Sequence, residues 1–171
     1  MAPSRLRLLA IASQLIMASY LAVDNHVDLA PWNDPDTAGP QLSSTLSGSI
    51  PAVATAVAFA IGARSLMLVG TIWTWVILAL QIRQWWVPYL FGSTFLHRSW
   101  GWYTDHGYDD TLSFLPRIAD HPVPDAQHLV LQALTLAMAV TSTVALSRTW
   151  SASSRTRIVL LSAPSRWATH P

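Results

Sequence analysis

The chain has 171 residues, of which 51% are hydrophobic and only 11% are charged. A soluble domain carries about 25% charged residues, so this composition indicates a protein that faces lipid over much of its surface. The absence of cysteine excludes disulfide bonds, thiolate metal sites and a cysteine nucleophile. Every acid is an aspartate, and apart from histidine every basic side chain is an arginine.

Four apolar segments make up most of the chain. A helix that crosses a membrane needs roughly 20 apolar residues, with about 17 to 25 tolerated. The first, third and fourth segments meet this requirement. The second is shorter and carries Pro51 near its start, where the first turn of a helix tolerates proline. The segments cover about residues 6–23, 47–61, 65–82 and 126–146. They predict an all-α, polytopic membrane protein with four transmembrane helices in a domain of residues 1–147.

The first segment allows a second interpretation, because a basic start followed by an apolar stretch is also typical of a secretory signal peptide. The apolar part is longer than the about 7–15 residues that such a signal usually has. We therefore expect an uncleaved first helix, with a cleaved signal as the alternative.

Charged residues are sorted between the connections. All nine aspartates lie in residues 24–46 and 83–125, whereas most arginines lie at the N-terminus, in the turn near residue 64 or after residue 147. With four spans the two acidic connections share one face, and the positive-inside rule places the basic face in the cytoplasm. We expect a multi-pass protein of the cell membrane with both termini cytoplasmic. The two acidic connections would then form an extracytoplasmic cap.

The C-terminal stretch, residues 148–171, is rich in serine and arginine and predicts a solvated, basic cytoplasmic tail. A short amphipathic part around residues 158–161 could lie on anionic lipid. Four arginines without a folded platform make a weak case for binding DNA or RNA. The expected partners are therefore the lipid bilayer and a hydrophobic small molecule, not a nucleic acid, and the oligomeric state is left open.

The connection 83–125 is about 40 residues long, and loops of more than about 12–15 residues are usually functional or disordered. Its stretch 97–110 holds two tryptophans, two tyrosines, two histidines and three aspartates. Because disordered segments are poor in aromatics, we expect this connection to fold, with residues 24–46 covering it. Trp32, Asp34 and Asp36 would then face Trp100, Tyr103, Asp105 and His106.

The aromatic side chains allow three interpretations: a belt at the membrane surface, packing within the loop, or the lining of a pocket. Tryptophan and tyrosine favour membrane–water interfaces, which suits those directly after the third span. The others lie further from a span, so pocket lining is an equal alternative for them. The candidate binding residues are Trp32, Trp85, Trp86, Tyr89, Trp100, Trp102, Tyr103 and Gln132.

The stretch "DHPVPDAQH", residues 120–128, precedes the fourth apolar segment. Asp125 is expected to be the N-cap of that helix, because aspartate suits both the cap position and the positive end of the helix dipole. His128 would then lie in the first turn. His121, Asp125 and His128 could hold a metal, but their spacing matches no strong zinc signature, so we favour capping and predict no metal.

Glutamines within the spans form a further candidate feature. Gln132 follows His128 by four residues and therefore shares its face of the helix. Gln14 and Gln81 could join it from the first and third segments, and an inward polar stripe in a membrane helix often marks a site. No Walker loop, Rossmann fingerprint or HExxH motif is present, so no cofactor is predicted.

Acidic groups next to aromatic rings suit acid catalysis on a lipid-soluble substrate. A half-buried carboxylic acid has its pKa raised by desolvation and can act as a general acid. Tryptophan and tyrosine faces stabilise cations when water is excluded. The sequence thus predicts a pocket between the two connections that contains at least one Asp, one His and two Trp. The candidate catalytic residues are Asp34, Asp105, Asp125, His106 and His128.

The predicted activity is an acid-catalysed isomerisation or cyclisation of a hydrophobic, isoprenoid-like molecule at the outer membrane face. The alternative is a non-enzymatic receptor, transport accessory or assembly factor that binds its ligand or partner through the cap. A structural membrane subunit is the third possibility, and it would show no stabilisation by a ligand.

Four short motifs carry a resemblance: "PWND" (31–34), "WWVPYLFG" (85–92), "FLP" (114–116) and "VPDAQHLVLQALTL" (123–136). Together they resemble a group of small bacterial four-span membrane proteins, which implies the topology but no particular activity. In size, hydropathy and residue types the chain is also similar to small bacterial and fungal integral-membrane terpene cyclases. No motif aligns with these cyclases, so no residue role is carried over from them.

Overall fold

The structure is a computed structural model that describes residues 3–33, 41–92, 99–105 and 111–162, and in these ranges it is helical, without strands. The elements are α1 (Arg5–Asp24), α3 (Leu42–Ile61), α4 (Arg64–Gln81), the π-helical η1 (Ile82–Trp86), α5 (Val87–Phe91), α6 (Trp100–Thr104) and α7 (Ala126–Ser162). Four stretches are long and apolar enough to cross a membrane: Arg5–Asp24, Leu42–Ile61, Arg64–Phe91 and Ala126–Ser151. The predictions of an all-α chain and of four apolar spans are confirmed.

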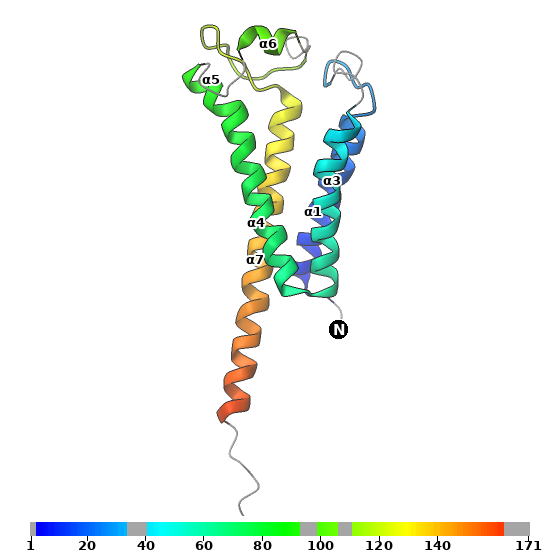
Figure 1. Cartoon of the computed structure of the whole chain (residues 1–171), viewed down its shortest axis with the longest axis vertical. Coiled ribbons are helices and arrows are strands. Elements are labelled where there is room, and N and C mark those ends of the chain that lie inside the picture. Colours follow the sequence, from blue (N-terminus) through cyan, green and yellow to red (C-terminus); the bar gives the residue numbers. More distant parts are fainter. Residues whose placement is uncertain (1–2, 34–40, 93–98, 106–110, 163–171) are drawn as a thin grey trace, which may run out of the picture.

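The four long helices form a bundle in which α1 packs against α3 and α7, and α4 packs against α7 (Figure 1). A short turn joins α3 to α4 at one end. At the other end lie α5, α6 and the segment that leads into α7 (Figure 1). The helix α7 continues well past the end of the bundle that carries the α3–α4 turn (Figure 1).

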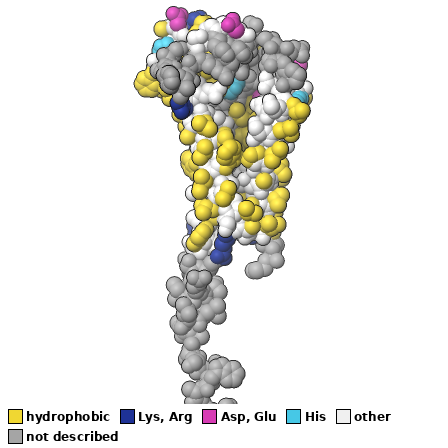
Figure 2. Space-filling model, in the orientation of Figure 1, with side chains coloured by type: hydrophobic (Ala, Val, Ile, Leu, Met, Phe, Trp, Pro, Cys, Tyr) yellow, Lys and Arg dark blue, Asp and Glu magenta, His cyan; other side chains and the backbone are white. Residues whose placement is uncertain are grey.

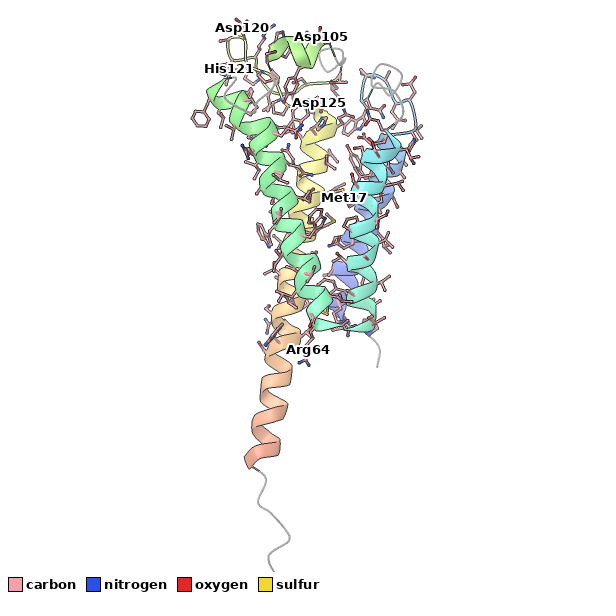
Figure 3. All side chains as sticks on the ribbon, in the orientation of Figure 1. Met17, Arg64, Asp105, Asp120, His121 and Asp125 are labelled. Carbon is pink, nitrogen blue, oxygen red and sulfur yellow. The ribbon has the colours of Figure 1, made fainter. Side chains whose placement is uncertain are left out.

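The sides of the bundle are apolar, and charges gather at its ends. Side chains such as Leu9, Val69 and Ile72 are more than half exposed, and Figure 2 shows apolar side chains along the bundle between its two ends. Asp105 and Asp120 lie at one end and Arg64 lies at the other (Figure 3). An apolar band with charges only at its ends is the surface that a lipid bilayer requires.

The second span begins earlier than the sequence predicts. The helix α3 starts at Leu42 instead of near residue 47, so Pro51 lies in its interior and the expectation of a first-turn proline is wrong. A proline inside a helix removes one backbone hydrogen bond. The carbonyl that loses its donor is that of Ser47, and membrane helices tolerate such a loss where neighbouring polar groups supply another donor. Thr55 Oγ1 donates to the Pro51 carbonyl itself at 2.7 Å.

The third span is longer than the sequence predicts, because η1 and α5 extend α4 from the expected end at residue 82 to Phe91. Trp85, Trp86 and Tyr89 therefore lie on a helix instead of in a loop. Trp85 and Tyr89 are only 5% and 6% exposed, which contradicts a membrane-interface belt for these two side chains. Likewise, α7 continues beyond residue 146 as far as Ser162.

Arg7 joins the start of α1 to the end of α3. Its Nε donates to the Phe59 carbonyl at 2.7 Å, and its Nη2 donates to the Phe59 carbonyl and, at 2.8 Å, to that of Ala60. These carbonyls belong to the last turn of α3, where no intrahelical donor remains. Gly62 ends this helix in the left-handed conformation, with φ of 76°.

Arg7→Gln is expected to lower the free energy of unfolding by about 1.5–3 kcal/mol, the usual value of hydrogen bonds to a charged group. The measurement is unfolding in mixed micelles, followed by circular dichroism. Arg5→Gln is the control, because Arg5 is an exposed arginine on the same helix. Equal losses in the two variants would show that the contacts of Arg7 with α3 contribute nothing.

Candidate functional site

The carboxylate of Asp125 is fully buried at the start of α7 and is surrounded by donors. Its Oδ1 accepts the backbone N–H of His128 at 2.8 Å, which confirms the predicted N-cap. Its Oδ2 accepts from Thr111 Oγ1 at 3.2 Å and from Gln127 Nε2 at 3.3 Å. The carboxylate is thus held in one orientation by backbone and side chains from two segments.

The His128 ring is held on two sides. Its Nδ1 donates to Asp125 Oδ1 at 2.7 Å, and its face lies against Trp85 with ring centroids 3.7 Å apart and an interplanar angle of 36°. Trp85 in turn meets Tyr103 edge to face at 5.0 Å. We call Asp125, His128, Trp85, Tyr103 and Thr111 the outer cluster.

A local irregularity of the third span positions Trp85. A π-helical turn inserts an extra residue and changes the direction of the side chains that follow, and such turns are frequent at functional sites. Pro88 lacks the N–H that would bond the Gln84 carbonyl in a regular helix. The hydroxyl of Tyr103, itself only 1% exposed, donates to this carbonyl at 3.1 Å. The Gln84 carbonyl that Pro88 leaves free therefore binds Tyr103 and holds α6 at the outer cluster.

The ionisation of Asp125 differs from the sequence-based expectation. Burial alone raises the pKa of the carboxyl, as we expected for a general acid. The charge of His128, the hydrogen bonds from its ring and backbone, and the Gln127 amide outweigh burial, so the pKa lies below the ordinary value. Asp125 is thus an ionised carboxylate at neutral pH, and a role as the proton-donating acid is corrected to that of a group that orients His128.

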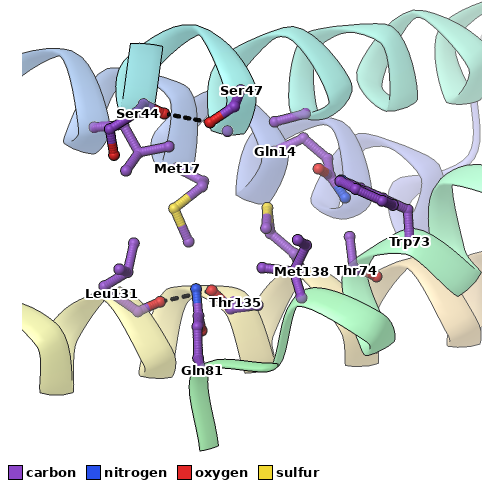
Figure 4. Close-up of a pocket in the computed structure, with 14 residues that line it drawn as sticks. Gln14, Met17, Ser44, Ser47, Trp73, Thr74, Gln81, Leu131, Thr135 and Met138 are labelled. Atoms are coloured by element: carbon purple, nitrogen blue, oxygen red, sulfur yellow. Dashed lines mark hydrogen bonds between the residues drawn. The ribbon is translucent and has the colours of Figure 1, made fainter. Parts of the chain in front are cut away.

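Four helices line a partly open cavity of ≈ 350 Å³ below the outer cluster, which we call the central cavity (Figure 4). Met17 from α1 and Met138 from α7 point into it (Figure 4). Its lining comprises Gln14, Met17, Leu21, Ser44, Ser47, Gly48, Ala52, Trp73, Thr74, Ile77, Gln81, Leu131, Thr135 and Met138. Most of this surface is apolar, and none of these side chains is ionisable.

The predicted glutamine stripe contributes to this region. Gln14 and Gln81 line the central cavity, and each has a buried Oε1 without a hydrogen-bond partner. Gln132 is buried nearby on α7, where its Oε1 accepts from Trp86 Nε1 at 2.6 Å and its Nε2 is unpaired. Sequence reasoning missed the other cavity residues, because methionine, serine and a single tryptophan inside apolar spans carry no pattern of their own.

Other sequence-predicted residues are dispersed. Trp32 donates through Nε1 to Asp24 Oδ1 at 3.0 Å. Trp100 lies under the guanidinium of Arg117, 4.4 Å from its carbon to the ring centroid. Asp105 is exposed. The expected meeting of Trp32 with Trp100, Tyr103 and Asp105 therefore stays a prediction. Asp34, Asp36 and His106 lie outside the described residues, as does the side chain of Trp102.

The two connections do contact each other, since the Leu112 N–H donates to the Pro31 carbonyl at 2.8 Å. A hollow of ≈ 430 Å³ in the second connection is lined by Trp100, Thr104, Thr111, Ser113, Leu115, Arg117 and Val123. Among the described residues its lining contains one Trp and no Asp or His, so this hollow is not the predicted pocket.

A metal site is not formed by the residues considered for one. His121 bonds the Tyr89 carbonyl through Nδ1 at 2.8 Å, whereas Asp125 and His128 bond each other. Within the described ranges no three His or Asp side chains form a group that could hold a metal ion.

Fold and cavity together define a four-helix, multi-pass membrane protein with a cavity between its helices beneath a histidine–aspartate pair. Comparison of the chain with protein-family models, with curated proteins and with solved structures gives no match. The resemblances to bacterial four-span proteins and to terpene cyclases therefore stay predictions, and the function has to be argued from the site itself.

Proposed function

We propose that the protein binds a hydrophobic, isoprenoid-like small molecule in the central cavity and isomerises or cyclises it at the outer cluster. The observation that carries this proposal is the fixed imidazole of His128, held by the Asp125 carboxylate at 2.7 Å and covered by the face of Trp85. A histidine oriented through Nδ1 by a buried carboxylate is a common arrangement for proton transfer through Nε2.

The outer cluster and the central cavity adjoin along two helices. Leu131 lines the cavity one turn of α7 below His128, and three residues' separation places both on one helix face. Gln81 lines it four residues before Trp85. A molecule bound at the outer end of the cavity thus lies next to the turn that carries the imidazole.

The proposed chemistry at the outer cluster follows from the side chains of His128, Asp125 and Trp85. Protonated His128 would give its Nε2 proton to the substrate hydroxyl, whose C–O bond then breaks and releases water. The carbocation rearranges, the same water adds to it, and the proton that this addition releases returns to Nε2, so the reaction is a net isomerisation. The ionised Asp125 stabilises the imidazolium, and the Trp85 face stabilises positive charge that develops nearby.

Topology forms part of the same proposal. The basic ends and the Arg64 turn lie in the cytoplasm and the outer cluster lies at the outer face of the cell membrane, since arginines gather opposite the aspartates. The connections before α3 and before α7 then form an extracytoplasmic cap, which the Leu112–Pro31 hydrogen bond supports.

A non-enzymatic receptor or transport accessory is the second candidate. One observation favours it: no ionisable side chain lines the central cavity among the described residues. Binding there would need no acid or base, and the outer cluster would only stabilise the start of α7.

Turnover of nerol tests the proposal. Nerol is a ten-carbon isoprenoid alcohol whose acid-catalysed cyclisation gives its isomer α-terpineol, measured by gas chromatography on protein in micelles. His128→Gln is expected to lower the rate at least about 100-fold, the usual contribution of general acid–base catalysis, while nerol still raises the unfolding temperature. His121→Gln should retain activity, because the His121 ring bonds the Tyr89 backbone carbonyl and is not part of the outer cluster.

Two results would speak against catalysis. Unchanged turnover in His128→Gln would remove the proposed role of the imidazole. Stabilisation by nerol without any conversion in the unaltered protein would favour the receptor.

A further inference from the structure

We infer that the molecule bound in the central cavity is a small neutral alcohol, whose hydroxyl donates a hydrogen bond to the side-chain oxygen of Gln14 or Gln81. This inference rests on the part of the proposed function that makes the cavity a ligand site, and it does not require catalysis. Four features of the cavity lead to it.

Gln14 provides the first feature, because its side chain is 0% exposed and only its amide nitrogen has a hydrogen-bond partner. Its Nε2 donates to Ser142 Oγ at 3.2 Å. The Oε1 is left without a partner at the cavity. A buried acceptor without a donor is unfavourable, and a ligand hydroxyl removes this cost.

Gln81 provides a second acceptor in the same cavity, on α4, nearer the outer cluster. Figure 4 shows its side chain directed from α4 toward Leu131 of α7. Two unpaired amide oxygens from opposite helices in one cavity make a site that selects hydrogen-bond donors.

The hydroxyl groups of the lining do not supply these donors. Thr74 Oγ1 donates to the Thr71 carbonyl at 2.8 Å, and Thr135 Oγ1 donates to the Leu131 carbonyl at 2.8 Å. Ser47 Oγ donates to the Ser44 carbonyl at 3.0 Å. Each of these donors is bonded within its own helix, so none of the three is available to the two amide oxygens.

Charge and size narrow the class of occupant. A charged group in a membrane interior is costly without a partner charge, and no ionisable side chain lines the cavity in the described chain. The volume of ≈ 350 Å³ lies at the lower end of the about 300–1,000 Å³ of small-molecule sites. Its apolar walls fit a hydrocarbon body. The occupant is therefore a small apolar molecule with a hydroxyl, as in short isoprenoid alcohols.

The test compares nerol with nerol methyl ether, which keeps the carbon skeleton and loses only the donor. Binding to the purified protein in detergent micelles is measured by titration calorimetry. Nerol is expected to bind about tenfold more tightly than the ether, equivalent to one well-placed hydrogen bond. In the Gln14→Met/Gln81→Met variant the ratio should fall to about one, because no acceptor remains.

Matched controls distinguish the loss of the hydrogen-bond acceptors from a change in cavity shape and from a loss of folding. Met17→Leu changes the lining with little change of volume and should keep the tenfold ratio. Partitioning into micelles is the same for every variant and cancels when ratios are compared between variants. If the double variant does not fold, Gln14→Met alone is expected to lower the ratio.

The outcomes distinguish this inference from the proposed function. Equal binding of nerol and its ether, or a full ratio in a folded double variant, would overturn the alcohol inference while the cavity remained a ligand site. Binding of neither compound would overturn both the inference and the ligand site. Loss of discrimination in the double variant, with Met17→Leu unchanged, would support the inference.

Discussion

Gly70→Ala is expected to separate α3 from α4 and lower the free energy of unfolding by about 1–3 kcal/mol, the usual cost of overpacking. A Cβ at Gly70 would come closest to Thr55 Oγ1, and it would lie 2.6 Å from the Thr55 Cγ2 and 2.9 Å from the Thr55 Cβ. Thr55 cannot turn away easily, because its χ1 is restricted in a helix and its Oγ1 bonds the Pro51 carbonyl. The loss outweighs the up to about 1 kcal/mol that alanine gains in helix propensity.

Two further variants identify the cause of this loss. Gly101→Ala is the matched control, because a Cβ there would meet only Ser99 Oγ at 3.8 Å. Adding Thr55→Ala to Gly70→Ala removes the two closest atoms and should recover part of the stability, which a double-mutant cycle in mixed micelles measures. A gain of stability in Gly70→Ala alone would show that the two helices do not approach closely at this point.

Sequence reasoning placed the spans well because their main determinant is local. Apolar length decides whether a helix can cross a membrane, and it is read directly from the residues. The ends were less predictable: the polar start of α3, residues 42–46, carries no apolar signal, yet it is helical. The turn that extends the third span depends on π-helical geometry around Trp85 and on Pro88. No periodic pattern in the sequence predicts this geometry.

The candidate site was predictable where it depends on one helix and not where it depends on two connections. The N-cap of Asp125, the proximity of His128 and the glutamine stripe follow from spacing along helices. The partners of Trp32 and Trp100 depend on how two irregular segments cross, which spacing does not determine. Trp32 bonds Asp24 of its own connection, and Trp100 pairs with Arg117, so each aromatic finds a closer partner than expected.

Asp125→Ala is expected to cost about 3–5 kcal/mol of unfolding free energy, as when one partner of a buried ion pair is removed. The change deletes the N-cap of α7 and leaves His128, Thr111 and Gln127 without their common acceptor. Asp125→Asn keeps a good N-cap residue but loses the charge, so it should cost less than alanine. Unfolding in mixed micelles measures both.

Lowering the pH of the unaltered protein should likewise reduce its free energy of unfolding, because it protonates Asp125. The pKa of Asp125 in the folded state lies below its ordinary value of 3.8, since the hydrogen bonds and the charge of His128 outweigh burial. The unfolded chain therefore takes up the proton first as the pH falls. The stabilisation is fully present above the ordinary value and is lost as the pH falls toward and through the lowered one.

Comparison with an exposed aspartate isolates this contribution. Asp120 lies 97% exposed beside Arg117, and Asp120→Asn should change neither the stability nor its acid dependence appreciably. In Asp125→Asn the acid-dependent loss should be smaller than in the unaltered protein, because the titrating group is gone. If both variants lost stability with acid as the unaltered protein does, other carboxylates would carry the dependence. The Asp125–His128 pair would then be too weak to hold the imidazole at the outer cluster, and the proton-transfer proposal would lose its structural basis.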